Sequence, residues 1–181
     1  VFDGQKKGKY TEDDIPCPLG VYGKSKFEGE NAIKKIGGKF YIFRTSWIYS
    51  NIKNNFYFTI KRQIQKGNKL KIVSDQNGVP TSNYFIAKQI KKIIPLLNKN
   101  NIGIYNLVPD GSCSWYEFAK KIIDQVNPDF IKNIYPIDSE NFPSNAKRPL
   151  NRCLKKKKVK KMFMLEFEDW FIEFKKFTYE A

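Results

Sequence analysis

The chain of 181 residues contains no histidine. This absence excludes histidine as a general acid or base, a Ser-His-Asp arrangement and a histidine-ligated metal within these residues. Cysteine is scarce: only Cys17, Cys113 and Cys153 occur, an odd number without a close pair, so neither a disulfide framework nor a zinc site is supported. Proton transfer is left to tyrosine, lysine and carboxylates, and the free thiols favour a reducing cytoplasm. We predict no metal site.

Long hydrophobic runs are also missing, since no apolar segment approaches the roughly 18 residues that a membrane span needs. We therefore expect no membrane partner. Acidic residues are few, 18 against 33 basic ones, which gives a net charge of +15. The densest basic run covers residues 155–161, but no aromatic platform or recognition-helix pattern accompanies it. The sequence argues against a nucleic-acid partner, and we interpret the run as the solvated start of a helix.

A glycine-rich phosphate-binding turn is the last notable absence. Neither Gly-x-Gly-x-x-Gly nor Gly-x-x-Gly-x-x-Gly occurs anywhere in the chain. Such turns place backbone N–H groups and a helix N-terminus against the pyrophosphate of a dinucleotide. These residues alone therefore contain no complete dinucleotide site.

What is present is an alternation of helical and extended patterns. Apolar residues at helical spacing, capping residues and β-prone runs predict an α/β fold with parallel strands and right-handed crossovers. Ser114 and Glu117 form a predicted capping box, and residues 40–43 are a continuous apolar run typical of a buried strand. Helices are expected over 22–36, 55–65, 83–98, 115–126 and 167–177, and strands over 39–49, 70–73, 104–108 and 131–137.

Tyr22 and Lys26 are the most informative pair. Four residues apart in a helix, they lie on one face, and the ammonium favours phenolate over phenol, which suits a proton donor. Spacing alone does not single them out, because a half-buried tyrosine beside a solvated lysine would look the same. The same spacing recurs at Tyr49/Lys53, Tyr57/Lys61, Tyr84/Lys88 and Tyr116/Lys120.

The surroundings of Tyr22 distinguish it from the other four tyrosines. Four motifs follow one another in order: Val1-Phe2-Asp3-Gly4, then Pro18-Leu19-x-x-Tyr22-Gly23-Lys24-Ser25-Lys26-x-x-Gly29-Glu30, then Phe43-Arg44-Thr45-Ser46-Trp47, then Asp75-Gln76-x-Gly78-x-Pro80-Thr81. Together they resemble the dTDP-4-dehydrorhamnose reductase family of extended short-chain dehydrogenases/reductases. The resemblance extends to about residue 154.

The resemblance implies the C-terminal part of a Rossmann-type parallel sheet with helices, plus a small substrate-binding α/β portion. Residues 1–60 would belong to the cofactor domain and 61–181 mainly to the substrate portion, with 81–108 returning to the main sheet and no clean boundary. The family's glycine-rich turn precedes these segments. We therefore expect the chain to be an incomplete piece of a longer reductase.

The implied reaction is NADPH- or NADH-dependent reduction of the C4 ketone of a dTDP-linked 6-deoxy sugar. Tyr22 would donate the proton and Lys26 would hold the nicotinamide ribose. The resemblance also assigns Tyr22, Lys26, Arg44, Thr45 and Ser46 to the cofactor, and Phe2, Asp3, Trp47, Thr81 and Arg148 to the substrate.

Alternatives stay open from the sequence. Trp47 could be a core residue, and Arg44 could organise structure rather than bind a ligand. The whole protein could instead be a non-catalytic regulatory module, or a related nucleotide-sugar epimerase or dehydratase. A homodimer is also left open.

Overall fold

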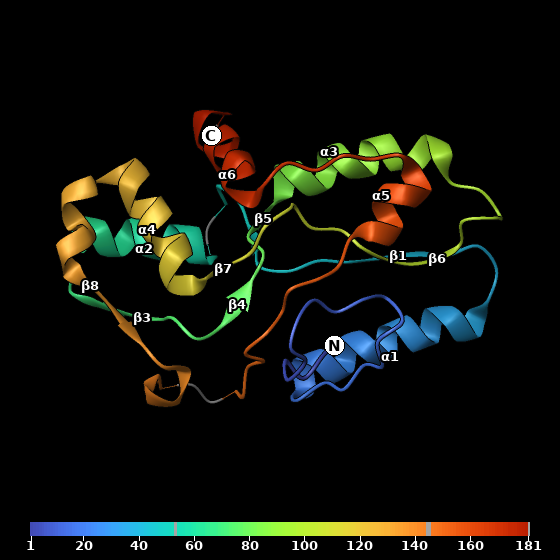
Figure 1. Ribbon diagram of the computed structural model, residues 1–181, viewed down its shortest axis with the longest axis horizontal. Coiled ribbons are helices and arrows are strands. Elements are labelled where there is room, and N and C mark those ends of the chain that lie inside the picture. Colours follow the sequence, from blue (N-terminus) through green and yellow to red (C-terminus); the bar gives the residue numbers. More distant parts are fainter. Residues whose placement is uncertain (53, 144–145, 181) are drawn as a thin grey trace.

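The computed structural model describes residues 1–52, 54–143 and 146–180. Helices and strands alternate along the chain (Figure 1), so the predicted α/β fold is confirmed. The helices are α1 (Val21–Ile36), α2 (Phe56–Lys66), α3 (Asn83–Ile93), α4 (Trp115–Val126), α5 (Lys157–Phe163) and α6 (Trp170–Glu180), with short 3-10 turns at Ile94–Leu96, Pro128–Asn133 and Ser139–Asn141. The strands are β1 (Tyr41–Arg44), β2 (Ile48–Tyr49), β3 (Leu70–Val73), β4 (Asn77–Gly78), β5 (Thr81–Ser82), β6 (Gly103–Asn106), β7 (Cys113–Ser114) and β8 (Ile134–Ile137).

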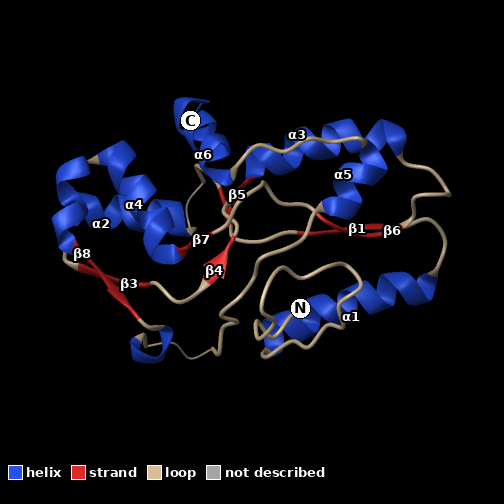
Figure 2. Cartoon of the chain, viewed as in Figure 1, coloured by secondary structure: helices blue, strands red, loops and turns tan. Residues whose placement is uncertain are grey.

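Two parallel strand pairs organise the two ends of the molecule. At one end β1 pairs with β6, and α1 with the N-terminal loop lies on the opposite side of this pair from α3 and α5 (Figure 1). At the other end β3 pairs with β8 beside α2 and α4 (Figure 2). Between them, β2 pairs with β5 in parallel and β4 pairs with β7 in antiparallel fashion. The β1–β2 segment therefore leads from one end toward the middle.

Aromatic side chains form a large part of the core. Tyr49 is buried and meets Phe177 edge-to-face, with ring centroids 4.9 Å apart, and Phe118 at 5.3 Å. Burial of such large rings is a main source of stability in a domain of this size. A second cluster joins β6, α3 and α5 through Tyr105, Phe85 and Phe163.

Most predicted elements are confirmed, but the strand expected over 39–49 is wrong as one continuous element. It is interrupted between β1 and β2, where Trp47 adopts φ +43°, a left-handed conformation that few non-glycine residues occupy. The strand expected over 131–137 starts only at Ile134, because Pro128 opens a 3-10 turn over the preceding residues. The last helix likewise starts at Trp170 rather than at residue 167.

Helix α1 has the expected bounds but an unexpected environment. Ile33 and Ile36, which the amphipathic pattern placed on an apolar face together with Ala32, are exposed, and Ile36 is 86% accessible. Glu30 is the residue of α1 that is buried. Within the described parts of the chain, no element covers the apolar face of this helix.

The basic run is only partly the solvated helix start that the sequence predicts. Lys157 does begin α5, but Lys156 is buried, and its Nζ donates to the carbonyl oxygen of Pro109 at 2.6 Å and lies 3.0 Å from a carboxylate oxygen of Asp110. Burial is tolerated because the charge is paired. Among the described helices, none is both long and apolar enough to cross a bilayer.

Candidate active site

Tyr22 and Lys26 lie in the first turns of α1 as the sequence predicts. Gly20 caps the helix, and Gly23 lets the preceding loop approach closely, because a Cβ there would meet the Cβ of Pro18 at 2.9 Å. The Nζ of Lys26 is 5.6 Å from the centre of the Tyr22 ring. The phenol is 78% exposed, so its hydroxyl is free to reach a bound molecule.

Other pairs with the same spacing show why exposure matters. Lys61 lies 5.1 Å from the ring centre of Tyr57, and Lys120 lies 5.9 Å from that of Tyr116. The contact is thus a consequence of helical spacing. Tyr57 is a core residue, 5% exposed, whose ring packs edge-to-face against Phe174 and Phe177. In the pair Tyr49/Lys53, the lysine lies outside the described residues.

A buried ion pair fixes α1 to the sheet. The Nε and Nη2 atoms of Arg44, in β1, donate to the two carboxylate oxygens of Glu30 at 2.8 and 2.7 Å. This bidentate geometry is the strongest form of arginine–carboxylate pairing. Arg44 thus has a structural role, and its Nη1 is buried with no partner among the described residues.

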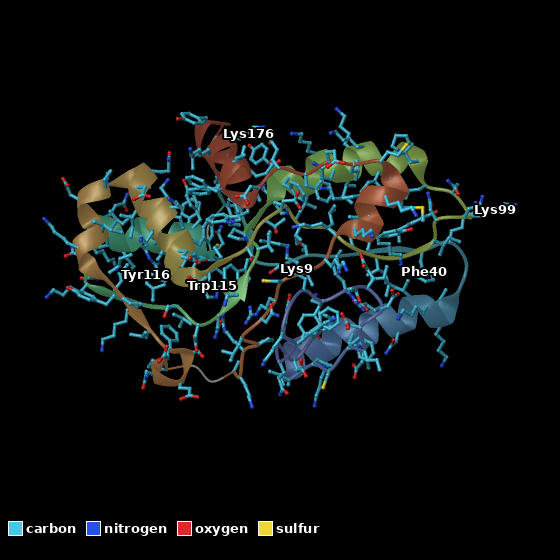
Figure 3. All side chains as sticks on the ribbon, in the orientation of Figure 1. Lys9, Phe40, Lys99, Trp115, Tyr116 and Lys176 are labelled. Atoms are coloured by element: carbon cyan, nitrogen blue, oxygen red, sulfur yellow. The ribbon has the colours of Figure 1, made fainter. Side chains whose placement is uncertain are left out.

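Trp47 follows β1 at the carboxyl end of the strand, where ligands gather in α/β sheets. Its ring stacks on Trp115 with centroids 3.6 Å apart, and Gly78 lies so close that a Cβ there would be 2.4 Å from the indole. Figure 3 shows Trp115 toward the middle of the molecule and Phe40, just before β1, at its far end. The indole N–H of Trp47 is buried and has no acceptor among the described residues.

Ser46 and Thr81, two other predicted site residues, are buried and hydrogen-bonded within the protein. Thr81 is fully buried, and its hydroxyl donates to the carbonyl oxygen of Val79 at 3.0 Å. The backbone N–H of Val79 in turn donates to Ser46 Oγ at 3.5 Å. Thr45 Oγ1 is buried and has no partner among the described residues. Asp75 fixes its loop by accepting hydrogen bonds from the backbone and hydroxyl of Ser139.

Phe2 and Asp3 lie beside β1. The Phe2 ring stacks on Tyr10 at 4.2 Å, and the guanidinium of Arg44 lies 5.1 Å from its centre. Asp3 accepts a 2.7 Å hydrogen bond from the Tyr10 hydroxyl, which lowers the pKa of the Asp3 carboxyl. These contacts hold the first residues against the sheet.

Two arginines, Arg148 and Arg152, lie in the segment between β8 and α5. Arg148 is exposed, close to the undescribed residues 144–145. Arg152, which sequence reasoning missed, donates its backbone N–H to the carbonyl oxygen of Asn77 at 2.8 Å, next to the Gly78 that contacts Trp47. Its position four residues after Arg148 is the one signal that could have indicated it. Burial lowers the pKa of Arg152 to about 10, and the positive charge of Arg148 lowers it further.

Comparison with known proteins decides the family. The model of the family described as RmlD substrate binding domain matches residues 1–181. The chain belongs to this family. The predicted resemblance to the dTDP-4-dehydrorhamnose reductases is thereby confirmed.

Curated relatives of the family carry that reductase name. The chain is 39% identical over 177 residues to dTDP-4-dehydrorhamnose reductase of Aggregatibacter actinomycetemcomitans, which covers 94% of this chain and 60% of the relative. It is 32% identical over 186 residues to the enzyme of the same name from Escherichia coli K12, covering 99% of the chain and 62% of the relative. The chain thus spans about three fifths of the length of these relatives.

Solved structures agree on the fold. The dTDP-4-dehydrorhamnose reductase of Bacillus anthracis, solved in complex with NADP, has a TM-score of 0.89 and 32% identity, and it covers all of this chain and 62% of its own. A dTDP-glucose 4,6-dehydratase of the same organism, at 17% identity and a TM-score of 0.73, shares the fold alone. The Rossmann-type α/β class predicted from the sequence is confirmed.

Proposed function

We propose that the complete protein carrying this chain reduces the C4 ketone of dTDP-4-dehydro-L-rhamnose to dTDP-L-rhamnose, a step in the supply of sugar nucleotides for cell-surface polysaccharide. The exposed Tyr22, with Lys26 beside it in the first turns of α1, is the observation that carries the proposal. Membership of the family and relatives named for this reaction support it.

The residues present fit part of a nicotinamide site. Lys26 is exposed and can donate to ribose hydroxyls, and Arg44 Nη1 and Thr45 Oγ1 are buried polar atoms without partners among the described residues. We assign these residues, with Tyr22 and Ser46, to binding of NADPH or NADH. When bound, the cofactor supplies hydride. The pyrophosphate cradle is not among residues 1–181, because the chain contains no glycine-rich turn of that kind.

Tyr22 donates the proton to the oxygen that becomes the C4 hydroxyl. The Nζ of Lys26 lies 5.6 Å from the centre of the Tyr22 ring, so the ammonium and the phenol can reach the same bound molecule. Trp47 presents its free indole N–H at the carboxyl end of β1 and orients the sugar nucleotide together with Phe2, Asp3, Thr81 and Arg148. The free thiols of Cys17, Cys113 and Cys153 suit a cytoplasmic location.

Tyr22→Phe in the complete protein tests the assignment. We expect kcat to fall by roughly 10²–10⁴-fold, because general acid catalysis typically contributes that much, while dTDP binding stays near wild type. NADPH oxidation with dTDP-4-dehydro-L-rhamnose measures the first and calorimetry the second. Tyr116→Phe, which has the same lysine spacing, is the matched control and should keep full turnover.

Three results would contradict the proposal. Retained turnover in Tyr22→Phe removes the role of Tyr22. Wild-type protein that binds NADPH and dTDP but never turns over favours a regulatory module. Epimerised or dehydrated product favours a sister enzyme.

A further inference from the structure

A hollow of about 450 Å³ lies on the surface where the N-terminal loop meets the chain that leads into α5. Six lysines line it: Lys9, Lys155, Lys156, Lys157, Lys160 and Lys161. The N–H of Tyr10 donates to the carbonyl oxygen of Cys153 at 2.8 Å, and the N–H of Lys155 donates to that of Tyr10 at 2.7 Å. Figure 3 shows Lys9 beside this segment. Two segments far apart in the sequence thus form one basic surface.

Most of the ammonium groups at this hollow have no counter-charge. Lys156 lies 3.0 Å from Asp110, and Lys160 lies 3.2 Å from Asp110 and 3.1 Å from Glu166. The other four lysines are exposed and form no salt bridge in the part of the chain that the structure describes: Lys9, Lys155, Lys157 and Lys161. Like charges one helical turn apart, as in Lys157 and Lys161, destabilise a helix. The fold therefore concentrates positive charge here at a cost in stability.

The chemistry of the lining selects a compact anion that carries several charges. The volume falls in the range of about 300–1,000 Å³ that is typical of small-molecule sites. Among the described residues that line the hollow none is aromatic, so a nucleobase has no ring on which to stack. Lysine ammonium groups act as flexible point charges without the bidentate fork of arginine. We therefore expect the hollow to rank anions by their charge rather than by their shape.

We propose that this hollow binds a polyphosphate anion, inorganic or carried by a nucleotide, through the ammonium groups of Lys9, Lys155, Lys157 and Lys161. A short chain of phosphates places several negative charges within one small molecule, which matches these four unpaired charges. The inference goes beyond the proposed function, because it uses none of the residues assigned to the cofactor or to the sugar nucleotide.

Calorimetric titration of the complete protein with sodium triphosphate tests the inference. NADP⁺ and dTDP are kept at saturation, so that the sites of the proposed function are filled. We expect one triphosphate per chain, bound more tightly than pyrophosphate and much more tightly than phosphate. Raising the ionic strength from about 0.1 M to about 1 M shortens the Debye length from about 10 Å to about 3 Å, so affinity should fall more than tenfold.

Titration with ATP under the same conditions distinguishes the two sources of the phosphate chain. We expect ATP to bind more weakly than triphosphate, because its phosphates carry less charge and its base has no ring on which to stack. This result assigns the site to inorganic polyphosphate, and tighter binding of ATP assigns it to a nucleotide.

The variant Lys157→Gln/Lys161→Gln removes two of the unpaired charges and should weaken triphosphate binding roughly 5–50-fold. The matched control is Lys69→Gln/Lys71→Gln, which changes two exposed lysines outside the hollow and leaves the protein with the same net charge. Its affinity should stay within about threefold of wild type. Equal losses in the two variants would mean that triphosphate responds only to the overall charge, and the inference would be overturned.

Glu166 provides a variant with the opposite effect. Its side chain is 93% exposed and lines the hollow, where its negative charge competes with a bound anion. Glu166→Gln should strengthen triphosphate binding about two- to fivefold, whereas Glu140→Gln, at an exposed glutamate elsewhere, should not change it. This comparison decides alone if the double lysine variant does not fold. Unchanged affinity in Glu166→Gln, or no triphosphate binding by wild type, overturns the inference, while NADPH oxidation decides the proposed function separately.

Discussion

Breaking the ion pair between Glu30 and Arg44 should destabilise the protein more than any surface substitution. The two side chains are only 8% and 7% exposed, and they share two charge-assisted hydrogen bonds of 2.8 and 2.7 Å. Removing one partner of a buried pair costs about 3–5 kcal/mol, because the other charge stays buried without compensation. Glu30→Gln and Arg44→Met should each lower the free energy of unfolding by that amount.

The double variant Glu30→Met/Arg44→Met separates pairing from packing. Two apolar side chains of similar size leave no orphaned charge, so the double loss should be smaller than either single loss, and the coupling energy should be several kcal/mol. Part of the loss in the free energy of unfolding should persist in the double variant, because the Arg44 guanidinium also lies 5.1 Å from the centre of the Phe2 ring.

Urea denaturation of the complete protein measures all three free energies. Asp124→Asn is the control: it removes a surface pair with Lys121, 3.6 Å long and largely exposed, and should cost about 1 kcal/mol or less. The reasoning is refuted if each single variant loses no more free energy of unfolding than this control. It is also refuted if the loss in the double variant equals the sum of the two single losses. Either result would mean that the pair is solvated or that α1 is fixed by something else.

Other predictions follow from local contacts. Ser114→Ala should lower the free energy of unfolding by about 0.5–2 kcal/mol, as measured by urea denaturation, because it removes the capping box of α4; an unchanged midpoint would contradict the role of the cap. Gly78→Ala should cost about 1–3 kcal/mol and alter near-ultraviolet circular dichroism, because a Cβ would be 2.4 Å from Trp47; unaltered spectra would mean that the indole can move freely. Burial tends to raise the pKa of Asp110, but hydrogen bonds from Lys156 and a second lysine outweigh it and leave that pKa lowered. The stabilisation from Asp110 is therefore present above its ordinary pKa and is lost as pH falls through the lowered one. Asp110→Asn should make the free energy of unfolding depend less on pH in the acid range, and it should leave the buried Lys156 without its carboxylate partner. A variant with the same acid profile as wild type would contradict this role of Asp110.

Local sequence signals predicted the elements that local chemistry decides. Helix α4 has its expected bounds because Ser114 and Glu117 cap it reciprocally, and α1 ends where two glycines follow it. Helix-capping groups lie within a few residues of each other, so the pattern alone contains the information.

The features that the sequence did not predict depend on distant partners. The break between β1 and β2 arises where Trp47 stacks on Trp115 and meets Gly78, residues far along the chain. Lys156 is buried because Pro109 and Asp110 receive its ammonium, which a run of lysines cannot reveal. Tertiary contacts override local patterns in both cases.

The candidate site divides in the same way. Tyr22 and Lys26 were predicted from one helical turn and occupy it, whereas Arg152 lies beside β4 through its hydrogen bond to Asn77, which is far from it in sequence. The roles assigned to the site residues, and the division at about residue 60, stay predictions for the experiments above.

Residues 1–181 produced alone should associate through the face around α1 and β1. Ile36 and Val21 are 86% and 84% exposed, and β1 has β6 as its partner strand among the described residues, so one edge of β1 is open to pairing. Analytical ultracentrifugation of the isolated segment should show concentration-dependent association, and Ile36→Lys should reduce it. Met164→Lys changes an equally exposed apolar residue elsewhere, 85% accessible, and should leave association unchanged. A monomeric segment that unfolds cooperatively would show that this face needs no cover, and the exposed side of α1 would then be an ordinary solvated surface.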